Sequence, residues 1–121
     1  MSVADVNQGP LAGRHAVVTG GSRGIGLAIA RALVEAGANV TLMARDAVRL
    51  ESAIAVLRTR ATTQRLFAVA VDVADEASVN AAFAAARDAN GSIDILVNNA
   101  GVAESAPFAK TSVEQFQRLI D

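Results

Sequence analysis

Short apolar segments alternate along this chain with longer segments in which apolar residues recur every three to four positions. The short segments are rich in Val, Ile and Leu, as is typical of strands covered on both faces. The longer segments are rich in alanine and carry a helical period. This alternation predicts parallel strands joined by helical crossovers. The expected strands are 16–19, 40–43, 66–71 and 93–97.

Helices are expected between and after these strands. In the first, over 25–36, Ile25, Ile29 and Leu33 share one face, and Gly37 is placed to end the helix. The second helix is expected over 47–59, with Asp46 as its N-cap. The third is expected over 76–89 after Asp75, with Val79, Phe83 and Ala86 facing inward and Asn90-Gly91 at its end. The last is expected to begin near Ser112, with Gln115 completing a capping box.

These elements predict an α/β fold, a doubly wound parallel sheet that is truncated after about four strands and has the strand order 3-2-1-4. Residues 1–12 are expected to form a flexible arm, in which Gly9-Pro10 breaks regular secondary structure. Residues 13–121 are expected to form a single, incomplete domain. The length of 121 residues fits one domain.

Composition excludes several classes of function. The net charge of −1 gives no basic surface for nucleic acid. The absence of cysteine and the single histidine, His15, argue against a metal site, and His15 is expected to be a surface residue. No apolar run approaches the roughly 18 residues of a membrane helix. Because the N-terminus also lacks the basic start of a secretory signal, a cytoplasmic location is expected.

A glycine-rich loop is the strongest chemical signal, because it lies between a predicted strand and a predicted helix. Gly20 permits a tight turn, Gly24 lets the backbone approach a pyrophosphate, and Gly26 lets the helix pack closely on the strand. The helix N-terminus then offers unpaired N–H groups to phosphate. The loop sequence is Thr19-Gly20-Gly21-Ser22-Arg23-Gly24-Ile25-Gly26.

Two further motifs follow in order: Asp72-Val73 ends the third strand, and Asn98-Asn99-Ala100-Gly101 follows the fourth. With the Thr-Gly loop, they make residues 11–121 resemble the compact branch of the short-chain dehydrogenases/reductases. The resemblance implies a Rossmann domain that binds a nicotinamide cofactor. It implies phosphate contacts from Gly20, Gly21, Ser22, Arg23, Gly24, Ile25 and Gly26, adenine contacts from Asp72 and Val73, and contacts near a ribose from Asn99, Ala100 and Gly101.

The end of the second strand bears on which cofactor is bound. An NAD enzyme usually has an acidic residue there to hold the ribose 2′-hydroxyl. This chain has Ala44 followed by Arg45, and a guanidinium at Arg45 can pair with a 2′-phosphate. Asp46 is expected to cap the next helix instead. NADP(H) is therefore favoured over NAD(H). The alternative is that Arg45 is a solvated surface charge that does not bind the cofactor.

The family's chemistry also needs a Tyr, a Lys four residues later, and a Ser. This chain has no Tyr, and its one Lys, Lys110, lies in a loop, so no catalytic residue is assigned. The chain is expected to be the cofactor-binding half of an enzyme, cut in the middle of a helix. The complete protein is expected to act on a small carbonyl or alcohol, such as a 3-oxoacyl substrate, and to form a homo-oligomer.

Two other interpretations stay open at this stage. The chain could itself be a non-catalytic nucleotide-binding module, which binds NADPH without turnover. A methyltransferase that binds an adenosyl cofactor is disfavoured, because that cofactor has no phosphate for the arginine of the glycine loop.

Overall fold

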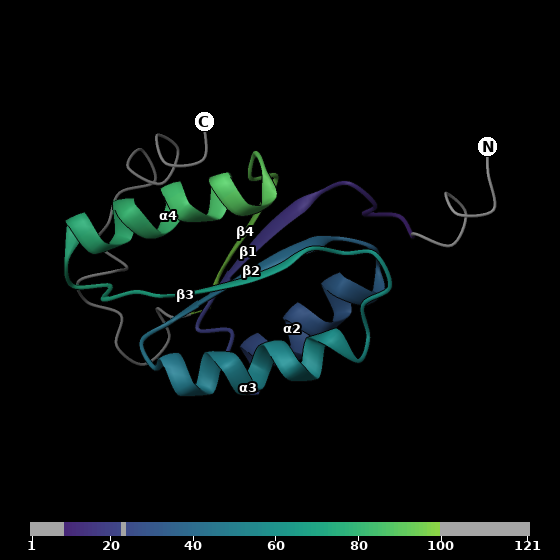
Figure 1. Cartoon of the computed structure of the whole chain (residues 1–121), viewed down its shortest axis with the longest axis horizontal. Coiled ribbons are helices and arrows are strands. Elements are labelled where there is room, and N and C mark those ends of the chain that lie inside the picture. The colour runs from purple at the N-terminus through teal and green to yellow at the C-terminus, as the bar shows by residue number, and fades with distance from the viewer. Residues whose placement is uncertain (1–8, 23, 100–121) are drawn as a thin grey trace.

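The computed structural model describes residues 9–22 and 24–99, and within them it contains a four-stranded parallel sheet (Figure 1). The strands lie in the order β3-β2-β1-β4, as the sequence predicts. Their bounds are β1 His15–Thr19, β2 Asn39–Ala44, β3 Leu66–Ala70 and β4 Ile95–Asn98. The last strand starts two residues later than expected. The fourth expected helix, from Ser112, lies outside the described residues.

Helices cover both faces of the sheet. On one face lie α2 (Gly24–Glu35) and α3 (Ala47–Arg58), and on the other lies α4 (Glu76–Asn90) (Figure 1). The sheet therefore separates two apolar clusters. One joins α2 and α3 to Val18, Val40 and Leu42, and the other joins α4 to Val17 and Met43. Burial on both sides explains why the middle of β1, residues 16–18, is apolar throughout.

The ends of the helices follow local sequence signals. Asp46 caps α3 by accepting from the backbone N–H groups of Val48 and Arg49. Asp75 caps α4 in the same way, and Gly91, with φ of 87°, ends it. Gly37, with φ of 102°, follows the end of α2. The predicted capping roles of Asp46 and Gly37 are confirmed.

The buried face of α2 differs from the predicted one. Ile25 is 73% exposed, and the residues that face the sheet are Gly26, Ala30 and Val34. Each lies one position after a residue of the predicted Ile25, Ile29, Leu33 face. The helix packs through small side chains, which bring its axis close to the strands. In α4, the predicted inward residues Val79, Phe83 and Ala86 are buried.

The expectation that His15 is a surface residue is wrong. His15 is 1% exposed, and its ring lies between Gly91 and Thr41. Nδ1 is 2.9 Å from the Gly91 carbonyl oxygen, and Nε2 is 2.7 Å from Thr41 Oγ1. The amide of Asn90 also donates to Thr41 Oγ1, at 3.1 Å. Burial lowers the pKa of His15 below its ordinary value of 6.5, against smaller opposing effects from Gly91 and Asp94.

Part of the expected N-terminal arm contacts the domain. The Leu11 N–H donates to the carbonyl oxygen of Ala36 at 2.8 Å, and Leu11 packs against the α2–α3 cluster. A Cβ at Gly9 would also meet the backbone of Ala36. Residues 1–8 lie outside the described residues, and the boundary of the arm stays a prediction. Within 9–22 and 24–99, no helix has the length and apolar character needed to span a bilayer.

Candidate functional site

The predicted site residues converge on one edge of the sheet, at the carboxyl ends of its strands. Register places Thr19 beside Met43 on one side and beside Asn98 on the other. Ala44 pairs in turn with Ala70. The segments that follow all four strands therefore meet along this edge. In a doubly wound sheet this is the edge where ligands bind.

The loop after β1 turns sharply because of its glycines. Gly20 has a φ of 67°, and its N–H donates to the Met43 carbonyl oxygen at 2.7 Å. A Cβ at Gly26 would collide with the carbonyl oxygen of Gly20 and would lie 2.8 Å from Asn99 Nδ2. A Cβ at Gly21 would lie 2.7 Å from a methyl group of Leu42. The first turn of α2 is thus pressed against the end of β1, as predicted for Gly26.

Gly24 differs from these glycines. It begins α2 with a φ of 61°, and a Cβ built there meets no atom of the residues that the structure describes within 4 Å. The first turn of α2 contains no acidic side chain, whereas α3 and α4 begin behind aspartate caps. A glycine backbone that faces open space at the positive end of a helix fits the phosphates of a dinucleotide.

A hydrogen-bonded network joins this loop to the end of β4. The Asn99 N–H donates to Thr19 Oγ1 at 3.0 Å, and Asn99 Nδ2 donates to the Gly20 carbonyl oxygen at 3.3 Å. The Thr19 hydroxyl lies 3.2 Å from Asn98 Oδ1 and 3.3 Å from the Val97 carbonyl oxygen. The Asn-Asn motif therefore fixes the glycine loop relative to β4. These bonds show a structural role for both asparagines.

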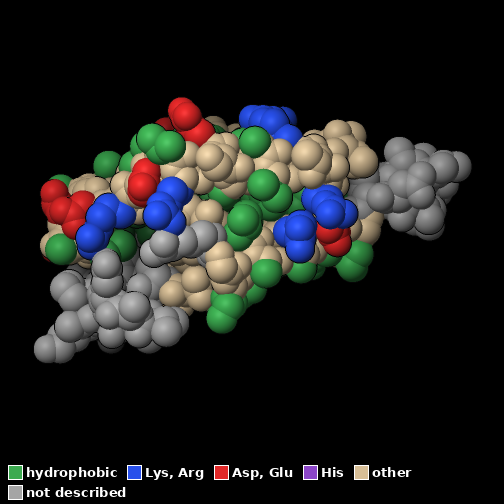
Figure 2. All heavy atoms as spheres, turned by 90° about the horizontal axis from the view of Figure 1, so that it is seen from below, with side chains coloured by type: hydrophobic (Ala, Val, Ile, Leu, Met, Phe, Trp, Pro, Cys, Tyr) green, Lys and Arg blue, Asp and Glu red, His purple; other side chains and the backbone are tan. Residues whose placement is uncertain are grey.

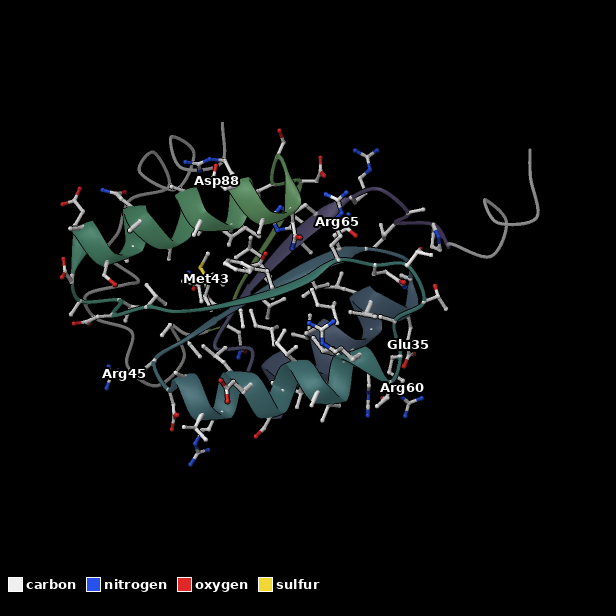
Figure 3. The ribbon with its side chains drawn as sticks, viewed as in Figure 1. Glu35, Met43, Arg45, Arg60, Arg65 and Asp88 are labelled. Atoms are coloured by element: carbon white, nitrogen blue, oxygen red, sulfur yellow. The ribbon has the colours of Figure 1, made fainter. Side chains whose placement is uncertain are left out.

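The end of β2 carries the basic residue of the predicted site. Arg45 follows Ala44, is exposed, and projects from the sheet edge near the start of α3 (Figure 3). Asp46 beside it is occupied as the N-cap, and its other carboxylate oxygen lies 3.4 Å from Arg49 Nε. An acidic residue committed in this way is a poor partner for a ribose hydroxyl. The arrangement agrees with the sequence-based assignment of Asp46 to the helix.

Asp72 lies just beyond the end of β3, in a turn that leads into α4. Its Oδ1 accepts from the Ala74 N–H at 3.0 Å, and its carbonyl oxygen accepts from the Asp75 N–H at 3.0 Å. Its own N–H donates to Ser78 Oγ at 3.0 Å. Asp72 is exposed, while Val73 packs against the α4 cluster. The turn role and a ligand role for Asp72 are compatible, because the side chain remains at the surface.

The structure therefore brings together most of the predicted cofactor-binding residues. The predicted residues that lie outside the described part of the chain are Arg23, Ala100 and Gly101. Sequence reasoning missed Ser78. The signal that would have found it is a serine at the third position of a helix, where a polar side chain can reach back to a preceding backbone N–H.

Charged side chains gather near both ends of α3. Figure 2 shows the face formed by α2 and α3, where basic and acidic side chains lie together toward each end and hydrophobic side chains lie between the two ends. The pairs are Arg49 with Asp46 at the start of α3, and Arg60 with Glu35, 3.9 Å apart, beyond its end. Only the first group lies at the edge that carries the glycine loop.

The short chain dehydrogenase family matches residues 14–121, and the chain belongs to this family. The 3-oxoacyl-(acyl-carrier-protein) reductase of rhamnolipid biosynthesis from Pseudomonas aeruginosa is 39% identical over 91% of this chain and 42% of that protein.

Solved structures show the same fold. An NADPH-bound short-chain oxidoreductase from Pseudomonas aeruginosa PAO1, described as containing an atypical catalytic center, is 45% identical and has a TM-score of 0.71 over 88% of this chain and 42% of that one. L-Sorbose reductase from Gluconobacter frateurii, solved with NADPH and L-sorbose, is 39% identical and has a TM-score of 0.71 over 94% of this chain and 43% of that one. The chain thus spans less than half the length of these relatives.

Proposed function

We propose that this chain supplies the cofactor-binding half of an oxidoreductase that transfers hydride between a nicotinamide cofactor and a carbonyl or alcohol. One observation carries the proposal. The glycine loop, held by Asn99 and by the close contact of Gly26 with Gly20, presents the open start of α2 at the edge where the strands end. Family membership supports the same chemistry.

Each segment at this edge has a part in holding the cofactor. Residues 20–26 and the N-terminus of α2 hold the pyrophosphate through backbone N–H groups. Asp72 and Val73 contact the adenine, and contacts near a ribose are assigned to Asn99, Ala100 and Gly101. When bound, the nicotinamide gives or takes a hydride, while the protein binds and orients it.

We propose NADP(H) as the preferred cofactor, with Arg45 pairing with its 2′-phosphate. Arg45 follows directly on the last residue of β2, and Asp46 is occupied by the α3 cap. Two of the solved relatives were determined with NADPH, which supports this choice. NAD(H) is the alternative cofactor, and a comparison of the protein's affinities for NADPH and NADH distinguishes the two.

The substrate is proposed to be a small ketone or the matching alcohol. The similarity to a 3-oxoacyl reductase and to L-sorbose reductase supports this class. The complete protein is proposed to form a homo-oligomer. A cytoplasmic location stays a prediction from the sequence.

The test of the site uses a matched pair of substitutions at Gly24 in the complete protein. Asn and Asp have the same shape, and both tolerate the left-handed backbone that Gly24 adopts. Gly24→Asp places a carboxylate where the phosphates are expected, and Gly24→Asn does not. We expect the dissociation constant for NADPH, followed by the fluorescence of NADPH itself, to rise at least tenfold more in the Asp variant.

Equal affinities of the two variants would contradict a phosphate site at Gly24. A wild-type protein that binds neither NADPH nor NADH would overturn the proposed function. Saturable NADPH binding without turnover on any carbonyl substrate would favour the non-catalytic nucleotide-binding module.

A further inference from the structure

Ser78 stands out because its hydroxyl is not used to cap the helix that carries it. In α4 the cap is made by Asp75, whose Oδ1 accepts from the N–H groups of Ala77 and Ser78. Ser78 Oγ instead accepts from the N–H of Asp72, six residues earlier and outside the helix, at 3.0 Å. Its contact is therefore with a residue of the candidate site.

Three groups of Asp72 form hydrogen bonds: the backbone N–H, the backbone carbonyl oxygen and the side-chain Oδ1. Its N–H is bound by Ser78, its carbonyl oxygen by the Asp75 N–H, and its Oδ1 by the Ala74 N–H. Two of these bonds belong to a turn that any Asp-x-x-Asp sequence can form. Asp75 at the end of this turn is also bonded to α4 as its cap, and the bond from Ser78 joins a side chain of α4 directly to the backbone of Asp72.

The position of this turn matters because it is joined to the end of β2. The Val71 N–H donates to the Ala44 carbonyl oxygen at 2.9 Å, so Asp72 and Arg45 each follow one member of a bonded pair. Both lie at the part of the edge assigned to the adenosine end of the cofactor. A small rotation at Asp72 would therefore change the distance from its carboxylate to the adenine.

We propose that Ser78 is a positioning residue, which fixes the backbone of Asp72 so that its carboxylate meets the amino group of the adenine. The inference rests on the proposed function, since it assumes an adenine at this edge. Holding one acceptor in place before the ligand arrives reduces the ordering that binding would otherwise require. The effect of Ser78 should therefore pass through Asp72 alone.

The experiment compares NADPH with deamino-NADPH, in which oxygen replaces the amino group of the adenine. A carboxylate accepts a hydrogen bond from the amino group and is not matched to the oxygen. In the complete wild-type protein we expect NADPH to bind roughly three- to tenfold more tightly than deamino-NADPH. Asp72→Ala should abolish this preference. Ser78→Ala should reduce it to about twofold or less, and Ser78→Thr, which keeps a hydroxyl, should restore most of it.

A matched control separates positioning from a general effect of losing a hydroxyl. Ser52 lies on α3, and its hydroxyl donates within its own helix, to the Val48 carbonyl oxygen at 3.3 Å. Ser52→Ala should leave the preference unchanged. In the Asp72→Ala background, Ser78→Ala should have no further effect on the affinity for NADPH, because the group it positions is gone.

The outcomes distinguish the two proposals. If the wild-type protein binds no nicotinamide cofactor, the proposed function fails. If it binds NADPH and prefers it to deamino-NADPH, but Ser78→Ala keeps the full preference, the positioning role is wrong. A loss of affinity for both cofactors by the same factor would also contradict it, since that result indicates a purely structural role in the turn.

Discussion

Ala44 accepts a hydrogen bond from the backbone N–H of Val71 at 2.9 Å, and this bond aligns the ends of β2 and β3. Arg45 follows the first residue of the pair and Asp72 follows the second. A basic side chain and an acidic side chain thus leave the sheet from neighbouring strands. This arrangement suits the adenosine half of a phosphorylated dinucleotide, which presents a phosphate and an amino group to the protein.

Arg45→Asp is expected to reverse the preference between NADPH and NADH. The substitution removes a charge-assisted contact with the 2′-phosphate and introduces a carboxylate that can accept from a 2′-hydroxyl. We expect the dissociation constant for NADPH to rise roughly 10- to 100-fold, since such contacts contribute about 1.5–3 kcal/mol. Equilibrium titrations with both cofactors measure the change.

Arg60→Asp is the control for this prediction. Arg60 lies beyond the other end of α3, near Glu35, and Figure 3 shows both residues far from Arg45. The Arg60→Asp substitution changes the net charge by the same amount as Arg45→Asp, but at a site away from the glycine loop. NADPH affinity that is unchanged by Arg45→Asp, or lowered equally by both substitutions, would contradict a 2′-phosphate site at Arg45.

Gly26→Ala is expected to destabilise the protein, although alanine is the better helix former. A Cβ at this position meets the carbonyl oxygen of Gly20, which belongs to the backbone and cannot move without disturbing β1. We expect the free energy of unfolding to fall by about 1–3 kcal/mol. Urea unfolding of the complete protein measures it, with Ala28→Ser on the exposed side of the same helix as a control that should change little.

Helix propensity alone predicts the opposite sign, because alanine is favoured over glycine by about 1 kcal/mol within a helix. A Gly26→Ala variant that is more stable than the wild type would show that the close contact between α2 and the loop is not needed.

The strand order, the helix ends and the glycine loop could be predicted because their signals are local. Asp46 and Gly37, for example, act on residues within a few positions of themselves. The predicted buried face of α2 is displaced by one residue from the observed one. The prediction followed the larger apolar side chains, whereas close packing on the sheet places the smaller ones inward. Ile25, the most apolar choice, is left exposed.

Burial of His15 could not be predicted because its partners are distant in the sequence. Thr41 and Gly91 are separated from it by 26 and 76 residues. Only the pairing of β1 with β2 and the return of the chain after α4 bring them together. Ser78 was missed for a different reason. Its bond to Asp72 is local, and a serine at the third position of a helix is a recognisable signal, but Asp75 already accounts for the cap of α4.

His15 is expected to make the protein sensitive to acid. The Gly91 carbonyl oxygen can only accept, so we assign the hydrogen to Nδ1, and Nε2 then accepts from the Thr41 hydroxyl. Protonation of Nε2 removes the acceptor for that buried hydroxyl. Burial lowers the pKa of His15 in the folded protein below 6.5, so the folded state binds fewer protons than the unfolded state.

Stability is therefore expected to be fully present above pH 6.5 and to fall as the pH drops from 6.5 toward the lowered pKa of His15. Two charged groups lie beside His15: Asp94, whose Oδ2 accepts from the backbone N–H of His15, and Arg14, which pairs with Asp94. Urea unfolding between pH 8 and pH 5 tests the prediction. His15→Gln should flatten the pH dependence in this window, and an equal slope in the variant would assign it to other groups.

The edge of the sheet at β4 leads to the last prediction. Among the described residues, β4 pairs with β1 on one side only, and Ile95, Leu96 and Val97 are partly buried apolar residues. An edge strand with this composition offers unpaired backbone groups to another chain. A polypeptide of these 121 residues, expressed alone, is therefore expected to self-associate or to have a low midpoint temperature of thermal unfolding. Sedimentation velocity and thermal unfolding test this, and a monomer with a cooperative transition at high temperature would show that the edge is already protected.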